Sequence, residues 1–395
     1  MALDVYKPHV SGVTNYVSLN KQALERAGHD VFVFAFGAPD PQEDDTNVVL
    51  SPGVSIANTS YTLGFSYTRA ARRMLQTMDV VHVHHPFLSG RLVLRCCRPL
   101  HIPIVFTNHT RYDLYAQVYL PILPDQLGQA FLQAYMPAFC GDVDLVIAPS
   151  EGLRRVLLAM GVDAGIEVIP NGVDLSPFRA GPKPMDRAAL GIPKDDLLLV
   201  FVGRLGLETN LAFLLRSFAG VQRAHHHVSL LLVGDGPDRD DLEDRARTAG
   251  VGDKVFFTGL VPYEDVPRYL TTADVFVTAS RTEVHPLSVI EALAAGLPVV
   301  GIDSPGVSDT VVDGENGFVA ADDVAAFTAK LGRLVMDSDL RKRMAASASR
   351  SAEAYDIDRT SAQIEARYRW LSAHKPRPRD SRWDRLWNRL MDRAS

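Results

Sequence analysis

The sequence predicts an α/β protein built from two doubly wound, Rossmann-like domains. Short apolar runs alternate with amphipathic helical patterns along most of its 395 residues. The runs lack polar alternation, which is typical of strands buried on both faces of a parallel sheet. The chain is also too long for one typical domain and comfortable for two. We therefore expect two helix-covered parallel sheets that face a cleft at the carboxyl ends of their strands.

The first block of alternating elements ends near residue 172. A helix is expected over Val13–Ala27, because Gly28 supplies a stop signal. Only Ala2–Tyr6 remain for a first strand, which is short for a buried strand and consistent with a shortened start. The other expected strands are His29–Phe36, Asp79–Val83, Pro103–Thr107, Leu145–Ala148 and Glu167–Ile169.

The second block follows an Asn-Gly turn signal at Asn171–Gly172 and a Pro-rich stretch, Pro177–Pro184. Helices are expected over Asn210–Arg223 and Asp238–Ala249, with Asn210 as a side-chain N-cap. The expected strands are Leu197–Val202, Val228–Val233, Val255–Thr258, Val275–Thr278 and Pro298–Gly301. The domains are accordingly placed at residues 1–172 and 173–355.

Composition excludes several classes of protein. The formal net charge of −6 argues against nucleic acid as a partner, because duplex-binding proteins usually carry a basic surface. Three cysteines form no disulfide framework and fit a reducing, cytoplasmic compartment. No apolar run reaches the ~18 residues of a membrane span, so we expect any contact with a membrane to be peripheral.

Two carboxylates flank a predicted helix start. Pro286 suits the first turn of a helix that ends at Gly296, which places Glu291 inside the helix and Glu283 in the preceding loop. Their eight-residue spacing spans roughly 12 Å at most. The two carboxylates could each accept hydroxyl hydrogens, while the helix N-terminus between them favours an anion. An amphipathic helix with one capping Glu is the alternative.

Glycine-rich turns follow two strands of the second block. Arg204 follows one strand, where a guanidinium can bind phosphate or pair with Glu208. Gly234 follows the next and permits close approach of a ligand to the backbone. Arg239 stands where the dinucleotide fingerprint needs its third glycine, so NAD binding is disfavoured. Gly12 makes a similar loop in the first domain.

His109 lies after the strand Pro103–Thr107, and we expect a side chain there to face the cleft. It could position a sugar hydroxyl or relay a proton, or it could be a satisfied loop histidine. His82, His84 and His85 have no carboxylate or Cys set nearby, and His225–His227 follow a helix end, where we expect them to be solvated. We therefore expect no metal site in either cluster.

Together these segments resemble family 4 retaining glycosyltransferases of the GT-B fold. The similar stretches occur in the family's order over residues 2–370: His9–Val13, Thr107–Thr110, Ile169–Asp174, Gly203–Asn210, Gly234–Pro237 and Glu283–Glu291. The resemblance implies hexose transfer from a nucleotide sugar with retention and without a metal or other cofactor. It also implies an acceptor-binding first domain, a donor-binding second domain and a helix at 356–374 that crosses back to the first domain.

The resemblance assigns roles to individual residues. His109 and Glu283 would be catalytic, Arg204 would hold the diphosphate and Glu291 the ribose. The residues implied to bind the donor are Gly12, Arg204, Thr209, Gly234, Phe257, Leu287, Ser288 and Glu291. Arg111 lies in Phe106–Tyr115, a segment that is similar to diacylglycerol glucosyltransferases and implies a lipid acceptor.

Thr209 departs from the family pattern, which usually places Lys five residues after the Arg. Losing a charge-assisted phosphate contact costs about 1.5–3 kcal/mol, or one to two decades in donor affinity. The resemblance therefore leaves open a weakened enzyme or a substitute cation. A second departure, Pro286 where Gly is common, removes one backbone donor.

Residues 375–395 form a basic amphipathic tail with seven Lys or Arg against three Asp. Trp383 and Trp387 lie on the same apolar face, which is typical of helices that bind an anionic membrane surface. Packing on the first domain is the alternative. Arg69, Arg72 and Arg73 could extend the basic surface. We expect a peripheral location at the inner face of the membrane.

The sequence thus predicts α-glycoside formation on a membrane lipid such as diacylglycerol. UDP-glucose is the favoured donor, and the residues do not exclude GDP-mannose. A soluble or polysaccharide acceptor is one alternative. A catalytically weakened nucleotide-sugar-binding protein is another, because Thr209 replaces the expected cation.

Overall fold

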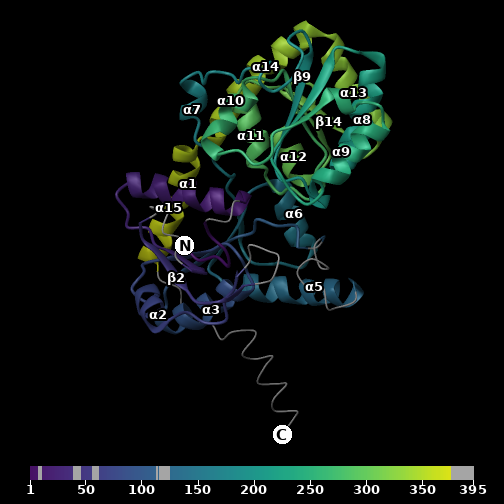
Figure 1. Cartoon of the computed structure of the whole chain (residues 1–395). Coiled ribbons are helices and arrows are strands. Elements are labelled where there is room, and N and C mark those ends of the chain that lie inside the picture. The colour runs from purple at the N-terminus through teal and green to yellow at the C-terminus, as the bar shows by residue number, and fades with distance from the viewer. Residues whose placement is uncertain (8–10, 39–45, 56–61, 113, 115–124, 375–395) are drawn as a thin grey trace. The chain divides into compact units, whose positions relative to one another are not determined.

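The computed structural model describes residues 1–7, 11–38, 46–55, 62–112, 114 and 125–374 (Figure 1). The chain divides into two compact units. The N-terminal unit contains Met1–Gly172 together with the segment that begins at Ile357, and the C-terminal unit contains Val173–Asp356. The N-terminal unit is therefore discontinuous in sequence, because the C-terminal unit is inserted between its two parts.

The N-terminal unit is built on a parallel sheet of short strands. Ala2 bridges both Phe34 and Val83, so residues at the start of the chain lie between β1 and β5 and join the pairs β1–β2 and β5–β6–β7–β8. A separate antiparallel pair is β3–β4. The strands are β1 Val33–Phe36, β2 Val48–Ser51, β3 Val54–Ser55, β4 Thr62–Leu63, β5 Val81–Val83, β6 Ile104–Thr107, β7 Leu145–Ala148 and β8 Ile166–Val168.

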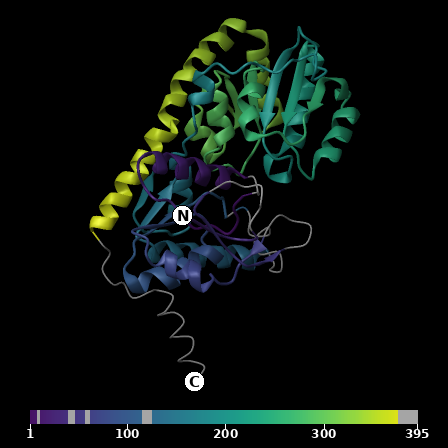
Figure 2. The ribbon, with the colours of Figure 1, turned by 60° about the vertical axis from the view of Figure 1, so that its left-hand side comes forward.

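Helices cover this sheet, and the last of them comes from the end of the described chain. Its helices are α1 Gly12–Arg26, α2 Arg69–Leu75, α3 Leu88–Cys97, α5 Asp125–Asp142, α6 Glu151–Ala159 and α15 Ile357–Ala373, with a 3₁₀ turn η1 Arg98–Leu100. Helix α15 lies beside α1 (Figure 2). Its Ile364 and Leu371 are buried in one core with Leu3, Tyr16 and Val105, so α15 completes the hydrophobic core of this unit.

The C-terminal unit contains a six-stranded parallel sheet in the order β11-β10-β9-β12-β13-β14. This is the doubly wound order, whose switch point lies between the first and fourth strands in sequence, here β9 and β12. Its strands are β9 Leu197–Val202, β10 Val228–Val233, β11 Val255–Phe257, β12 Val275–Thr278, β13 Val299–Ile302 and β14 Gly317–Ala320.

Alternate residues of these strands enter two different cores. Leu199 and Phe201 pack on one face of the sheet, whereas Leu198 and Val200 pack on the other. Because successive side chains of a strand point to opposite faces, uninterrupted apolar runs are required to fill both cores. Each fully buried side chain of this kind contributes about 1.5–3 kcal/mol to folding relative to exposure.

The helices of the C-terminal unit lie on both faces of its sheet (Figure 1). They are α7 Ser176–Arg179, α8 Leu211–Ala224, α9 Arg239–Thr248, α10 Val266–Leu270, α11 Leu287–Ala294, α12 Pro305–Thr310, α13 Val324–Met336 and α14 Ser338–Ala352. Four 3₁₀ turns are η2 Leu207–Thr209, η3 Gly252–Lys254, η4 Tyr263–Asp265 and η5 Glu353–Tyr355.

Asn210 is the N-cap residue of α8, as expected, but its side chain does not cap the helix. Asn210 does precede α8, but its backbone is left-handed, with φ 55°, and its side chain makes no cap hydrogen bond. Asn tolerates this conformation better than most residues. Asn210 therefore provides the sharp bend between η2 and α8 rather than a partner for the helix N-terminus.

Candidate active site

Two histidines lie together at the carboxyl edge of the N-terminal sheet. His84 follows β5 and His109 follows β6 after Asn108, so the parallel register brings both to one edge. The His84 Nδ1 and His109 Nε2 atoms are 3.1 Å apart, and the rings are stacked with centroids 5.3 Å apart. Tyr16 of α1 packs edge-on against His109 at 4.6 Å. The predicted residue His109 is therefore held by two neighbours.

Burial keeps these histidines uncharged. Burial, together with the positive charge of a protonated His85, lowers the pKa of His109 to about 3. It also holds the pKa of His84 well below its usual range. A neutral imidazole is a hydrogen-bonding group with one donor and one acceptor nitrogen. This edge of the sheet consequently offers hydrogen bonds without charge at neutral pH.

Gly12 and Arg111 belong to the same unit. Gly12 is the first residue of α1, whose N-cap Ser11 forms a capping box with Thr14. A Cβ at Gly12 would meet no atom within 4 Å, so open space lies beside its backbone. Arg111 is partly exposed and lies two residues after His109.

In the C-terminal unit, the predicted donor residues follow strands at or beside the switch point. Arg204 follows β9, Gly234 follows β10, and the segment from Glu283 into α11 follows β12. Ligands of doubly wound sheets bind at this position because the loops after the two central strands diverge there. The topology thus brings Arg204 and Glu283, 79 positions apart in sequence, to one edge of this sheet. We call this edge, with Gly234 and the first turn of α11, the C-terminal half-site.

Arg204 is free to meet a ligand. Its side chain is 60% exposed, and its nearest carboxylate oxygen is Glu208 Oε1 at 3.9 Å from Nε. An exposed ion pair at this distance contributes little to stability. The guanidinium can therefore exchange Glu208 for a phosphate at small cost.

Thr209 is turned away from solvent. Its side chain is 6% exposed, and its hydroxyl donates to the Gly206 carbonyl oxygen at 2.7 Å and lies 3.2 Å from the Arg204 carbonyl oxygen. The hydroxyl closes the turn that carries Arg204. Thr209 consequently stabilises the loop and presents no cation.

Backbone groups pack closely beneath this loop. Gly234 has φ +135°, and a Cβ there would lie 2.0 Å from the Gly203 carbonyl oxygen. The two loops are also joined by hydrogen bonds from Leu205 N to the Asp235 carbonyl and from Asp238 N to the Leu205 carbonyl, both 3.0 Å long. Only glycine fits at this close approach. Gly234 is therefore needed to hold the Arg204 loop in place.

Glu283 is partly buried in the loop after β12. Burial and the negative charge of Glu208 raise its pKa to about 7, while a hydrogen bond from Ser280 opposes the shift. Its carbonyl accepts a hydrogen bond from Gly306 N at the start of α12. A backbone hydrogen bond thus fixes the loop. Near neutral pH, the Glu283 carboxyl group is present in both the ionised and the protonated form.

Glu291 is 5% exposed on the second turn of α11. Burial raises its pKa to about 7, and the Tyr263 hydroxyl opposes this by donating to Glu291 Oε1 at 2.5 Å. Leu287 and Ser288 form the first turn of α11, where Pro286 makes no side-chain cap bond. First-turn N–H groups of a helix have no intrahelical acceptor, so they can bind an anion.

Phe257 ends β11, beside β10 in the sheet. The Arg239 guanidinium lies 5.9 Å from its ring centroid, and Gly234 bridges Gly259 just beyond the strand. Phe257 is therefore near Gly234 in the fold, on the outer side of the half-site.

Sequence reasoning missed Tyr263, Tyr16 and the contact of His84 with His109. His84 was treated only as a member of a histidine cluster without metal partners. Its position directly after β5 was the available signal, because His109 lies two residues after the end of the neighbouring strand β6. Tyr263 begins the short 3₁₀ turn η4, which is too short for a periodic pattern to mark it.

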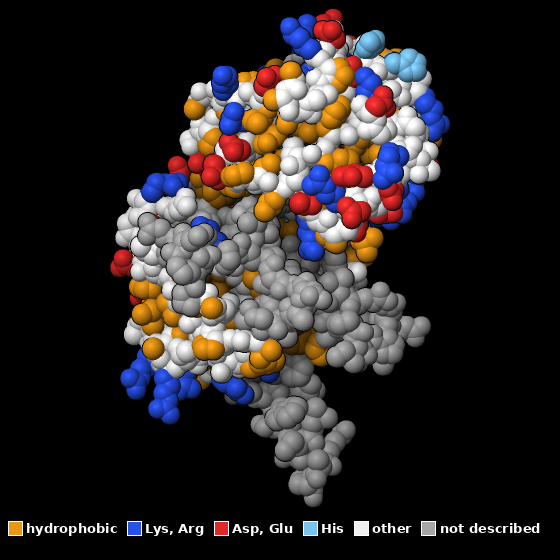
Figure 3. Space-filling model, viewed as in Figure 1, with side chains coloured by type: hydrophobic (Ala, Val, Ile, Leu, Met, Phe, Trp, Pro, Cys, Tyr) orange, Lys and Arg blue, Asp and Glu red, His pale blue; other side chains and the backbone are white. Residues whose placement is uncertain are grey.

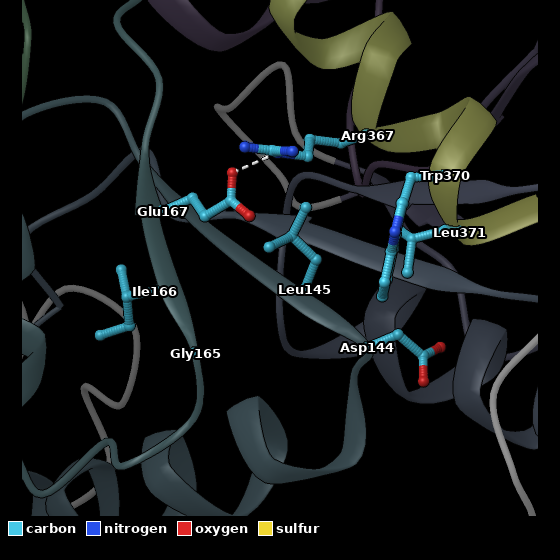
Figure 4. Close-up of a pocket in the computed structure, with 8 residues that line it drawn as sticks. All are labelled: Asp144, Leu145, Gly165, Ile166, Glu167, Arg367, Trp370 and Leu371. Carbon is cyan, nitrogen blue, oxygen red and sulfur yellow. Dashed lines mark hydrogen bonds and ion pairs between the residues drawn. The ribbon is translucent and has the colours of Figure 1, made fainter. Parts of the chain in front are cut away.

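A cavity of about 250 Å³ lies elsewhere on the N-terminal unit, between β8 and α15 (Figure 4). Arg367 of α15 pairs there with Glu167 of β8. None of the predicted site residues lines this cavity.

The described residues also bear on metal binding and on membrane insertion. In that part of the chain, no group of three or more His, Cys, Asp or Glu is placed to hold a metal ion. No described helix has the length and apolarity required to cross a lipid bilayer. The predicted membrane residues Trp383 and Trp387 lie outside the described residues.

The fold defines the class of protein. The crystal structure of HepE from Anabaena in complex with UDP-glucose aligns with a TM-score of 0.72, covering 94% of this chain and 99% of HepE at 17% identity. This likeness and the two parallel α/β units identify the GT-B fold of glycosyltransferases, as the sequence predicts.

Sequence comparison then defines the family. Models for "Glycosyl transferases group 1" and "Glycosyltransferase Family 4" match residues 182–351 and 10–177. An alpha-monoglucosyldiacylglycerol synthase from Streptococcus pneumoniae is 31% identical over 322 residues, covering 78% of this chain and 72% of that protein. A synthase of the same name from Acholeplasma laidlawii is 29% identical, covering 80% and 82%. The chain belongs to glycosyltransferase family 4.

Proposed function

We propose that this glycosyltransferase moves glucose from UDP-glucose to a membrane lipid acceptor such as diacylglycerol, with retention and without a metal ion, to form an α-glycoside. The similarity to alpha-monoglucosyldiacylglycerol synthases over about four-fifths of the chain carries the proposal. Their name specifies the sugar, the acceptor and the α-linkage. UDP-glucose is an α-linked donor, so an α-product means retention.

The C-terminal half-site supports a nucleotide-sugar donor. Arg204 supplies an available cation, and the N-terminus of α11 supplies free N–H groups for a diphosphate. Glu283 and Glu291 supply acceptors for sugar and ribose hydroxyls. In this proposal, the raised pKa of both carboxyl groups reflects burial that a bound donor offsets by hydrogen bonding.

The N-terminal unit supports a membrane acceptor through a basic face on α2 and α3. We define the basic face as Arg69, Arg72, Arg73 and Arg95, all of which are exposed. Neither helix contains Asp or Glu. Figure 3 shows Lys and Arg side chains gathered where Figure 1 labels α2 and α3. Met74 and Leu100 expose apolar side chains in the same segment.

An activity assay tests the proposed reaction. Purified full-length protein receives radiolabelled UDP-glucose or GDP-mannose, with vesicles of anionic phospholipid that contain or lack diacylglycerol. We expect label in the lipid extract only with UDP-glucose and diacylglycerol, unchanged by EDTA. Release of the label by α-glucosidase and not β-glucosidase checks the linkage. Labelling with GDP-mannose alone, loss with EDTA, or release by β-glucosidase would each contradict the corresponding part of the proposal.

Vesicle sedimentation tests the basic face. Replacing Arg69, Arg72 and Arg73 with Gln should weaken binding to anionic vesicles by about two decades, since each basic residue near the surface contributes ~1 kcal/mol. The matched control replaces Lys342, Arg343 and Arg350, which are exposed on α14. Equal binding by the two triple variants would exclude the basic face as the membrane contact.

A further inference from the structure

The contact between His84 and His109 restricts how His109 can hydrogen-bond. His109 is partly exposed, and its Nε2 atom is the nitrogen that meets His84. Nδ1 is therefore the ring nitrogen of His109 left for a ligand. His84 is fully buried, with 0% exposure. The two rings must share one proton across the 3.1 Å contact, because two bare nitrogens or two N–H groups would repel.

Two proton arrangements satisfy this contact. In the first, His84 Nδ1 donates to His109 Nε2, so that His109 carries its own proton on Nδ1 and His84 Nε2 is bare. In the second, His109 Nε2 donates, so that His109 Nδ1 is bare and His84 Nε2 carries a proton. In a neutral imidazole, one ring nitrogen carries a proton and the other does not.

The surroundings of His84 distinguish the two arrangements. Among the described residues, its Nε2 atom is buried without a hydrogen-bond partner. The adjacent His82 cannot serve it, because His82 Nε2 bonds the Thr107 hydroxyl at 2.7 Å and His82 Nδ1 bonds the Tyr368 hydroxyl at 2.5 Å. Buried N–H groups without an acceptor are rarer in proteins than under-satisfied acceptors. The first arrangement, with His84 Nε2 bare, is therefore favoured.

We propose that His84 is a positioning residue that fixes His109 in the Nδ1–H tautomer, so that His109 acts as a neutral hydrogen-bond donor to an oxygen of the substrate. The role of His109 at the substrate rests on the proposed function, whereas its tautomer does not. A donor at this place recognises a hydroxyl or phosphate oxygen and does not remove a proton. The burial that lowers the pKa of both rings keeps the donor neutral.

Nuclear magnetic resonance tests the tautomer without activity. Long-range ¹H–¹⁵N correlation of ¹⁵N-histidine-labelled full-length protein distinguishes Nδ1–H from Nε2–H, and the His109→Gln variant assigns the signal. We expect Nδ1–H in the unmodified protein. His84→Asn should retain it, since an amide can donate from nearly the position of Nδ1, whereas His84→Leu should shift His109 toward Nε2–H. An Nε2–H signal in the unmodified protein would overturn the proposal.

Kinetics test the consequence for the reaction. We expect His84→Leu to lower kcat about tenfold with KM for the donor within about twofold, and His84→Asn to restore most of the loss. Thr107→Val is the control, because it removes a hydroxyl that bonds His82 and Tyr16 in the adjacent buried network and leaves both rings of the His84–His109 contact in place. An equal loss in Thr107→Val, or full activity in His84→Leu, would overturn the proposal. Absence of any glucosyl transfer by the unmodified protein would instead contradict the proposed function.

Discussion

Both units carry polar side chains after the carboxyl ends of their strands. Those of the C-terminal unit are ionisable, whereas those of the N-terminal unit are neutral. In the C-terminal unit, the loops after β9 and β12 carry Arg204, Glu208 and Glu283, all ionisable. In the N-terminal unit, the strand ends carry His84 and His109, which burial keeps neutral. A doubly wound sheet thus determines where a site lies, whereas the residues after each strand determine what it binds. A charged half-site suits a diphosphate, and a neutral one suits hydroxyl groups.

The largest effect is expected from removing charge at the C-terminal half-site. Glu283→Gln should lower kcat/KM by about two to three decades, because in the proposed function it replaces an anionic acceptor that meets the transferred sugar. Steady-state kinetics with varied UDP-glucose measure this. The exposed Glu315→Gln variant is the control and should behave like the unmodified protein. A loss under tenfold would show that the charge of Glu283 is not used in the transition state.

Adding a positive charge to the same half-site should strengthen donor binding. Thr209→Lys should raise donor affinity by one to two decades if its ammonium group reaches the diphosphate. It should also cost about 1 kcal/mol of stability, because the hydroxyl bonds to Gly206 and Arg204 are lost. Isothermal titration with UDP measures the affinity. Thr209→Val separates the two effects, since it should lose stability without gaining affinity.

A smaller effect is expected at Tyr263. Its hydroxyl lowers the pKa of Glu291 against the effect of burial. Tyr263→Phe should therefore raise that pKa above about 7, protonate Glu291 at neutral pH and increase KM for the donor several-fold. The acid limb of kcat/KM should move to higher pH in the variant, because in the proposed function the ionised carboxylate accepts the ribose hydroxyls. An acid limb at unchanged pH would exclude this coupling.

The smallest expected effect is on stability. A carboxyl group whose folded pKa is about 7 and whose unfolded pKa is about 4.5 destabilises the fold increasingly as pH rises between these values. Glu291→Gln removes this dependence. The variant should therefore gain stability relative to the unmodified protein from pH 5 to pH 8, and thermal melting at each pH checks the trend. A constant difference in melting temperature would mean that Glu291 is not destabilised by burial.

Strands that feed both cores were predictable, whereas the edge strand β14 was not. Val228–Val233 and Val275–Thr278 match β10 and β12 because their apolar runs fill two cores. The sequence did not reveal β14, which contains Gly317 at a position where a Cβ would lie 2.2 Å from the Val299 carbonyl oxygen. There the close approach of two backbones selects a residue with low strand propensity.

The residues of the candidate site also divide into those that the sequence could reveal and those that it could not. Arg204, Glu283 and Glu291 could be found from a chemical residue type at a strand end or a helix start. The contacts of Tyr263 with Glu291 and of His84 with His109 join residues 28 and 25 positions apart. No local pattern encodes such pairs, because tertiary packing alone brings them together. Sequence reasoning also expected Thr209 to bind the donor directly, a role that stays a prediction, and could not show that its hydroxyl is occupied by the loop.

The insertion of the C-terminal unit into the N-terminal one has a consequence during synthesis. Residues 173–356 leave the ribosome after most of the N-terminal unit and before α15, whose Ile364 and Leu371 complete its core. At ~5–20 residues per second this interval lasts on the order of 10–40 s. For that time the nascent N-terminal unit has an uncovered apolar face, and the Tyr368 partner of His82 does not yet exist. The N-terminal unit is therefore synthesised first, but its hydrophobic core is completed last.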